Sequence, residues 1–110
     1  MPPTRFFKCM SDETRLLITL LVFLEKELCV CELVETLDES QSKISRHLAQ
    51  LRNCGILSDR RKDQWVFYSL NPDLSSWIRS VLKEVKKPMA DQLKYFQKNL
   101  TSIECRPARA

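Results

Sequence analysis

The fold is decided by residues 40–55, which read SQSKISRHLAQLRNCG. Ser40 is a typical N-cap residue, and Gly55 stands where a residue in left-handed conformation ends a helix at least cost. Between them, three apolar residues recur at helical spacing: Ile44, Leu48 and Leu51. We therefore predict a helix that is capped by Ser40, runs to about Asn53 and packs one face against a core.

The opposite face of this helix is polar and basic. At about 100° per residue, it carries Ser42, Lys43, Arg46, Ala49, Gln50 and Asn53. A helix fits the DNA major groove, and side chains of these types can donate hydrogen bonds to base edges and phosphates. The alternative is that the charges only solvate a surface.

The segments on either side predict a helix-turn-helix followed by a hairpin. A short helix from about Cys31 to Leu37 comes before the turn at 38–40. After Gly55 the pattern changes to two strands, Leu57–Arg61 and Gln64–Leu70, which are joined by a tight turn near Lys62 and Asp63. The expected fold class is mainly α with a small β-hairpin, a winged helix-turn-helix with a basic wing tip.

The outer segments are predicted to be helical. Ser11–Leu24, with Ser11 as its cap, is apolar on nearly all sides and should lie at the centre of the fold. A long helix begins at Asn71-Pro72, and Pro88 starts or kinks another. The last helix carries an apolar stripe at alternating steps of four and three: Met89, Leu93, Phe96, Leu100 and Ile103. We expect this stripe to associate with a second copy rather than with the chain's own core.

Residues 1–110 should form a single domain, because 110 residues with 44% apolar composition support one core. We expect the C-terminal helices, about 72–104, to dimerise and 105–110 to be a flexible tail. Pro2 and Pro3 should be frayed.

Composition excludes several classes of function. The single Gly rules out phosphate-binding loops with several glycines, and the single His rules out metal sites with several histidines. We therefore do not expect an enzyme. The longest apolar stretch is far shorter than the roughly 20 residues that span a bilayer, which predicts a cytoplasmic protein without a membrane partner. Five cysteines in such a protein indicate reduced thiols.

The net charge of +4 is modest, but it is unevenly distributed. Basic residues gather between Ser40 and Trp65, whereas acidic residues gather between Glu25 and Glu39. This pattern is expected of a surface that meets a polyanion.

Four motifs resemble the arsenical-resistance repressors of the ArsR/SmtB family. They are SDETRL at 11–16, ELCVCEL at 27–33, SQSKISRHL at 40–48 and WVFY at 65–68. The resemblance runs from about Phe6 to Leu82. It implies a homodimeric bacterial repressor that joins through its N- and C-terminal helices and binds double-stranded operator DNA, expected to be an inverted repeat. The resemblance places these residues in the DNA-binding surface: Gln41, Ser42, Lys43, Ser45, Arg46, His47 and Gln50 from the recognition helix, and Arg60, Arg61 and Lys62 from the wing.

The inducer site should be Cys29 and Cys31, because thiolates bind soft ions. The expected inducer is As(III) or Sb(III), with Cd(II) or Pb(II) as the alternative, and no cofactor is needed for DNA binding. Residues two apart on a helix point about 200° apart. We therefore expect the metal-free repressor to bind DNA, and ion binding to distort the turn that leads into the short helix and so to release the repressor.

The chain departs from the family pattern in two places. Val34 stands where family repressors commonly carry a third cysteine, so a third ligand would come from Cys9, Cys54, Cys105 or an external thiol, unless two sulfurs suffice. Cys9 and Cys54 are better explained as packing residues. Asp63 stands where the wing turn often has Gly, and Asp tolerates left-handed backbone better than most residues.

Two other functions stay open. The cysteines could form a redox or sulfur-species switch on the same DNA-binding repressor, because a thiol that binds a metalloid is also oxidisable. A thiol-disulfide oxidoreductase is the weaker alternative, since no βαβ pattern surrounds the cysteine pair.

Overall fold

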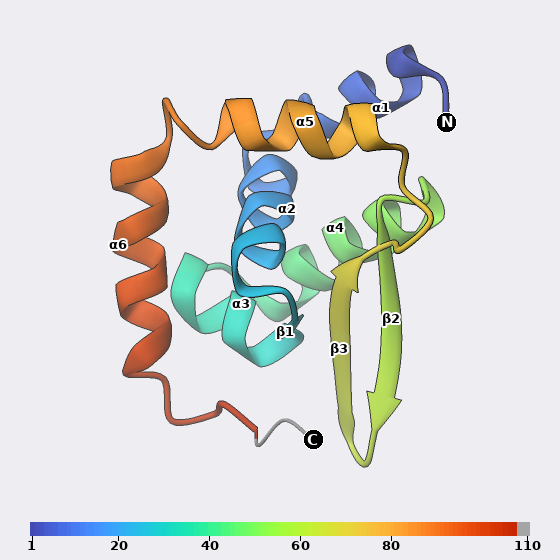
Figure 1. The fold of residues 1–110 in the computed structure, drawn as a ribbon. Helices are drawn as coiled ribbons and strands as arrows, with labels where there is room; N and C mark the ends of the chain where they lie inside the picture. Colours follow the sequence, from blue (N-terminus) through green and yellow to red (C-terminus); the bar gives the residue numbers. More distant parts are fainter. Residues whose placement is uncertain (108–110) are drawn as a thin grey trace.

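A computed structural model describes residues 1–107 of the chain. Figure 1 shows a central helix with one helix along the top of the view, another down its left side, a helix-turn-helix beneath the central helix, and a projecting hairpin. The elements in chain order are α1 Pro3–Met10, α2 Glu13–Glu25, β1 Leu28–Cys29, α3 Val30–Leu37, α4 Gln41–Asn53, β2 Leu57–Lys62, β3 Trp65–Leu70, α5 Ser76–Val85 and α6 Ala90–Thr101.

The central helix α2 is buried on several sides, as its apolar composition predicts. Its N-cap is Asp12, whose carboxylate accepts a hydrogen bond from the Arg15 backbone N–H at 3.0 Å. The prediction that Ser11 caps this helix is wrong. Ser11 ends α1 instead, and its hydroxyl donates to the Lys8 carbonyl at 2.7 Å. We expected Pro2 and Pro3 to be frayed, whereas Pro2 is the N-cap of α1 and Pro3 is its first residue.

Helices α3 and α4 form the predicted helix-turn-helix. Asp38 ends α3 in the left-handed conformation, with φ 52°, and turns the chain toward α4. The Ser40 hydroxyl accepts from the Lys43 backbone N–H at 3.2 Å, so the predicted N-cap is confirmed. The stripe of Ile44, Leu48 and Leu51 is fully buried. Helix α4 is therefore held by one face, while its opposite face is exposed.

The wing is a three-stranded antiparallel sheet in the order β1-β3-β2. Strands β2 and β3 are the predicted hairpin, and Lys62 opposite Trp65 leaves a two-residue turn. Asp63 in that turn has φ 56°, the left-handed conformation anticipated for it. The third strand, β1, was not predicted because it is two residues long. It pairs Cys29 with Phe67 and so joins the cysteine segment directly to the wing.

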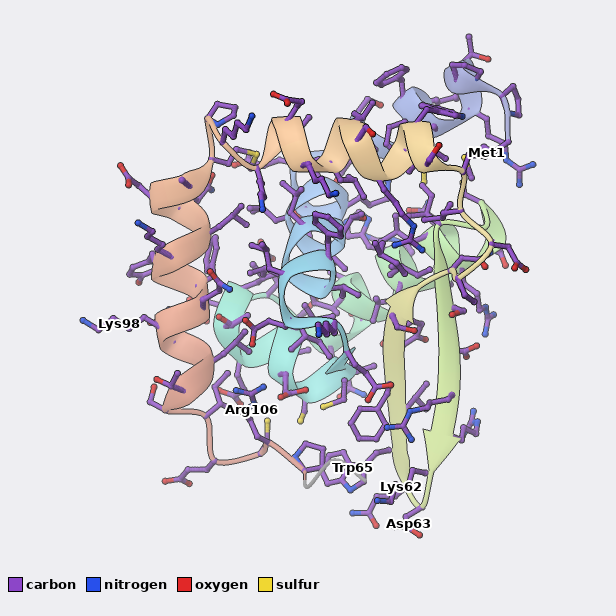
Figure 2. All side chains as sticks on the ribbon, viewed as in Figure 1. Met1, Lys62, Asp63, Trp65, Lys98 and Arg106 are labelled. Atoms are coloured by element: carbon purple, nitrogen blue, oxygen red, sulfur yellow. The ribbon has the colours of Figure 1, made fainter. Side chains whose placement is uncertain are left out.

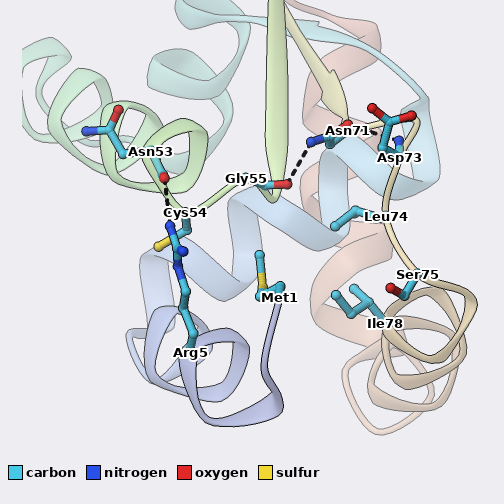
Figure 3. Close-up of a pocket in the computed structure, with 10 residues that line it drawn as sticks. All are labelled: Met1, Arg5, Asn53, Cys54, Gly55, Asn71, Asp73, Leu74, Ser75 and Ile78. Atoms are coloured by element: carbon cyan, nitrogen blue, oxygen red, sulfur yellow. Dashed lines mark hydrogen bonds between the residues drawn. The ribbon is translucent and has the colours of Figure 1, made fainter.

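Gly55 lies at the junction of α4 and the wing with φ +85°, as a residue that ends a helix should. The Asn71 side chain donates to the Gly55 carbonyl at 3.0 Å and accepts from the Asp73 backbone N–H at 2.9 Å (Figure 3). Because Asn71 is engaged in this turn, α5 begins at Ser76 rather than at the predicted Asn71-Pro72.

The apolar stripe of α6 packs on the chain's own core, contrary to our expectation of a second copy. Leu93 and Leu100 are buried, and Met89, Phe96 and Ile103 pack against the core. Two hydrogen bonds hold the helix in place, from the Thr36 hydroxyl to the Phe96 carbonyl at 2.8 Å and from Gln97 to Glu25 at 2.8 Å.

The prediction of a flexible tail covers residues 105–110, of which the structure describes 105–107. After α6 the chain turns back beneath α3, where Arg106 forms an ion pair with Glu32 (Figure 2). Residues 108–110 lie outside the described part of the chain. Within residues 1–107, no helix has both the length and the apolar character to cross a membrane.

Candidate nucleic-acid interface and thiol site

The exposed face of α4 presents five of the side chains proposed for DNA. Gln41, Ser42, Ser45, Arg46 and Gln50 are exposed, and Lys43 is partly exposed. Ser40, Gln41 and Ser42 at the N-terminal end of α4 are exposed, which is favourable beside a phosphate. The face that sequence periodicity predicted is therefore the face that solvent reaches.

Neighbouring groups partly engage two of these side chains. Lys43 forms an ion pair with Glu39 at 3.0 Å, and the Gln50 amide oxygen accepts from Arg15 at 3.0 Å. Within residues 1–107, by contrast, Arg46 forms no ion pair. Arg46 is the α4 cation that can reach an anion without first losing a partner.

His47 does not belong to the exposed face. Its side chain is 6% exposed, and its Nε2 atom lies 3.9 Å from Asp12 at the start of α2. Its Nδ1 atom is buried and has no hydrogen-bond partner among residues 1–107. We correct the assignment of His47 to the DNA surface, because α4 turns this side chain toward the core.

The three wing cations divide into two groups. Arg60 forms two hydrogen bonds of 2.7 Å with the carboxylate of Glu27 and lies 4.7 Å above the Phe67 ring. Arg61 and Lys62 form no ion pair within the described residues, and Lys62 and Asp63 mark the tip of the wing in Figure 2. Arg60 therefore braces the wing against the segment before β1, and its assignment to the DNA-binding surface stays a prediction.

Cys29 and Cys31 lie together where β1 meets α3. Their Sγ atoms are 3.3 Å apart. Cys29 is the N-cap of α3 with extended backbone, φ −95° and ψ 169°, so the two residues do not share a regular helix. The expectation that convergence requires distortion of the turn is wrong, because Cys29 lies outside the helix and the sulfurs have already converged.

Glu32 fixes the conformation of this pair. Its side chain is fully buried, and one carboxylate oxygen accepts from the Cys29 backbone N–H at 2.9 Å in a capping box. The other carboxylate oxygen accepts a hydrogen bond from Arg106 Nε, which also makes an ion pair. A buried carboxylate needs such partners, because burying an unpaired charge is costly.

Both thiols are held in the protonated form. Burial raises the pKa of Cys29, and the backbone N–H of Glu32 only partly offsets this effect. Burial also raises the pKa of Cys31, and the neighbouring Cys105 and Cys29 thiols raise it further. An incoming ion must therefore displace protons from both sulfurs.

The pair opens onto a hollow of about 390 Å³ between α3 and the wing. Its lining includes Cys29, Cys31, Val34, Gln41 and Trp65. The hollow thus joins the thiols to the first residue of α4 and to the wing strand β3.

The remaining cysteines occupy two places. Cys9 is buried in the core, and the pKa of its thiol is raised to about 12 by burial and by the neighbouring Cys54. Cys9 lies on α1 and Cys54 is the C-cap of α4. In Figure 1 these two elements meet at the end of the molecule away from β1. Cys105 instead lies beside Cys31, whose thiol donates to the Cys105 carbonyl at 3.3 Å.

Comparison with known proteins agrees with this geometry. A family described as bacterial regulatory protein, arsR family, matches residues 12–59, which cover α2 to the first half of the wing. The arsenical resistance operon repressor of Escherichia coli is 43% identical over 103 residues, which cover 94% of this chain and 88% of the relative. The chain belongs to the arsR family of bacterial regulatory proteins.

Two further relatives support the family assignment. An arsenic resistance transcriptional regulator of Pseudomonas putida is 56% identical over 85 residues, or 77% of this chain and 66% of the relative. The structure of reduced HlyU from Vibrio cholerae aligns with a TM-score of 0.68 and 36% identity over 77% of this chain and 85% of that one. As predicted, the homologues and the winged-helix fold are those of transcriptional regulators and not of enzymes.

Sequence reasoning missed three side chains that shape the arsR-family site: Glu27, Glu32 and Arg106. The spacing of Glu32, three residues after Cys29, is that of a capping box and could have been recognised. Nothing in the local sequence signals Glu27 or Arg106, because their partners are distant in the chain.

Proposed function

We propose that the chain is a homodimeric repressor that binds operator DNA when metal-free and releases it when trivalent arsenic or antimony binds Cys29 and Cys31. The observation that carries this proposal is the 3.3 Å separation of the two sulfurs at the start of α3. A pair of soft ligands at one point favours thiophilic ions.

The proposed DNA surface joins α4 to the wing tip. It consists of Gln41, Ser42, Lys43, Ser45, Arg46 and Gln50 on α4, with Arg61 and Lys62 on the wing. In this arrangement α4 enters a major groove and the wing cations contact phosphates or the adjacent minor groove. A dimer would place two such helices on successive grooves of an inverted repeat.

The site has two physical connections to this surface. Cys29 pairs with Phe67 through the β1–β3 ladder, and the hollow beside the thiols also contacts Gln41. An ion that holds the sulfurs in a different arrangement would bias both the wing and the start of α4. A ligand shifts a conformational equilibrium only by its differential affinity, and typical coupling is about 1–3 kcal/mol. Operator affinity would fall by roughly one to two decades.

The chemistry of the thiols favours arsenic over cadmium or lead. Arsenous acid is neutral, and each As–S bond forms as a thiol proton leaves with an arsenic-bound hydroxide as water. A divalent cation brings no such base, so it must bind against the raised thiol pKa values and release protons. The same raised pKa values also disfavour the redox-switch alternative, because the thiolate is the oxidisable form.

The proposed dimer surface is formed by α1 and α5 rather than by α6. Phe7 is 53% exposed, and its ring centroid lies 6.4 Å from that of Trp77 on α5. Val81 and Val85 continue this partly exposed stripe along α5. Partly exposed apolar residues in contact across α1 and α5 fit a second copy of the chain, whereas the stripe on α6 packs on the chain's own core.

The proposal is tested on duplex DNA selected by the protein from a random-sequence pool. We expect arsenite to lower the affinity of the native protein for this duplex by about ten- to a hundredfold. The double variant Cys29→Ser, Cys31→Ser should bind the duplex normally but should not release it, as measured by fluorescence anisotropy.

The matched control is Cys9→Ser, which removes a thiol in the core and should respond to arsenite as the native protein does. Release of DNA by the double serine variant on addition of arsenite would show that the inducer site lies elsewhere.

A further inference from the structure

The C-terminal tail is fastened to the thiol site at two points. The Cys31 thiol donates to the Cys105 carbonyl at 3.3 Å, and Arg106 pairs with the buried carboxylate of Glu32. Arg106 also donates to the Leu100 carbonyl at 3.4 Å and lies 3.9 Å from Glu25. Arg106 directly follows Cys105 and is thus anchored to Glu32, whose carboxylate is part of the capping box of α3. In Figure 2, Arg106 lies between the end of α6 and the underside of α3.

This anchoring brings a third sulfur next to the pair. The Cys31 thiol donates to the Cys105 carbonyl and contacts Cys29 Sγ, each at 3.3 Å, and the Cys105 thiol is near enough to raise the pKa of Cys31. Cys31 therefore lies between two other cysteines that come from different parts of the chain. Cys9 and Cys54 neighbour each other instead, and position 34 is a valine.

We propose that Cys105 is the third ligand of the inducer site and completes a three-thiolate centre for trivalent arsenic with Cys29 and Cys31. This inference rests on the proposed function. Arsenous acid, As(OH)₃, reacts with three thiols to give As(SR)₃ and three waters. Each As–O bond is replaced by an As–S bond, each thiol proton leaves in water, and arsenic stays trivalent.

The tail must shift to complete this centre. No group of three His, Cys, Asp or Glu residues within 1–107 already has the arrangement of a metal site. Arsenic would draw the Cys105 sulfur inward, while Arg106 holds the tail close enough for this capture to be intramolecular. Arg106 is thus a positioning residue that acts through Glu32.

The test is native mass spectrometry of the reduced full-length protein with arsenite and no added thiol. The native protein should gain one arsenic per subunit and lose three protons. Cys105→Ser should give an adduct that keeps one hydroxide on arsenic and loses two protons, and its arsenite affinity should fall on the order of 100-fold. The matched control Cys54→Ser should behave as the native protein does.

Arg106 is tested in both cysteine backgrounds. Arg106→Ala should keep the three-thiolate mass but bind arsenite more weakly, and Arg106→Lys should restore part of the loss. In the Cys105→Ser background, Arg106→Ala should have no further effect on arsenite affinity, because it acts only by positioning Cys105. An equal loss in both backgrounds would overturn the positioning role.

The outcomes separate this inference from the proposed function. If Cys105→Ser shows the same adduct and affinity as the native protein, or if Cys54→Ser loses the three-thiolate adduct instead, Cys105 is not the third ligand. Arsenite-dependent release of DNA would still stand in both cases. If the native protein binds no arsenite, both this inference and the proposed function fail.

Discussion

The basic side chains of α4 and the wing differ in how readily they can bind DNA, although the sequence places them in one basic group. Arg46 is exposed and free of ion pairs within residues 1–107, whereas the wing residue Arg60 is bound to Glu27 at 2.7 Å. A cation that already has a carboxylate partner attracts a phosphate less strongly, because the carboxylate offsets its charge. The two arginines should therefore contribute unequally.

We predict that Arg46→Ala weakens binding to the selected duplex by about 1–3 kcal/mol, the usual cost of a lost base or phosphate contact. Arg60→Ala is the matched control and should cost less in DNA affinity, while arsenite affinity should be unchanged in the Arg46 variant. Fluorescence anisotropy measures both. A larger loss for Arg60→Ala would contradict the assignment of Arg60 to the wing brace.

Asp12 supports a pH-dependent prediction about stability. The hydrogen bond from the Arg15 backbone N–H is the main cause that lowers the pKa of this carboxyl below its ordinary value of 3.8. A lowered pKa in the folded state means that the charged cap contributes stability above the ordinary pKa. That contribution is lost as the pH falls through the folded value.

At neutral pH, Asp12→Ala should lower the free energy of unfolding by about 1 kcal/mol, as expected for a lost N-cap. The difference from the native protein should narrow at about pH 3. Asp12→Asn, which keeps a capping oxygen, should lose less at neutral pH. Urea unfolding at the two pH values measures these differences, and a constant difference would exclude the linkage.

Among the elements, the wing depends on a turn that most residues would strain. Asp63 has φ 56°, and it lies in the two-residue turn between Lys62 and Trp65, which are directly opposite each other. Left-handed backbone costs an ordinary L-residue roughly 1–2 kcal/mol, less for Asp and nothing for Gly.

Asp63→Gly should therefore keep or slightly raise the thermal midpoint, whereas Asp63→Val should lower stability by about 1 kcal/mol or more. Differential scanning calorimetry makes the measurement. Because the wing touches β1, the valine variant also shows whether wing strain reaches the thiol pair. Equal stability of the glycine and valine variants would indicate that the turn changes its conformation in response.

The whole molecule should be a dimer through α1 and α5. We predict that Phe7→Glu, which places a charge on the exposed part of the proposed interface, shifts the protein from dimer to monomer and weakens DNA binding at least tenfold through lost avidity. Sedimentation velocity measures the shift. Tyr95 on α6 is 63% exposed, so Tyr95→Glu is the matched control and should leave the dimer intact.

Local patterns were sufficient for the helix-turn-helix and the hairpin. The Ser40 cap, the buried stripe of α4 and the left-handed Gly55 and Asp63 all depend on residues within one or two turns of each other. The periodicity also separated the exposed face of α4 from the buried one, whereas the family resemblance assigned His47 to the DNA-binding surface. The core contact of this side chain with Asp12 became visible only in the fold.

The features that correct the sequence reading all arise from contacts between segments far apart in the chain. Arg60 meets Glu27 across 33 positions, and Arg106 meets Glu32 across 74. The α6 stripe is apolar whichever surface it covers, so its periodicity could not choose between its own core and a second copy. Likewise, a cysteine two residues from another shows which chemistry is available. Whether their sulfurs meet, and whether a third joins them, depends on where the strand, the helix and the returning tail pack together.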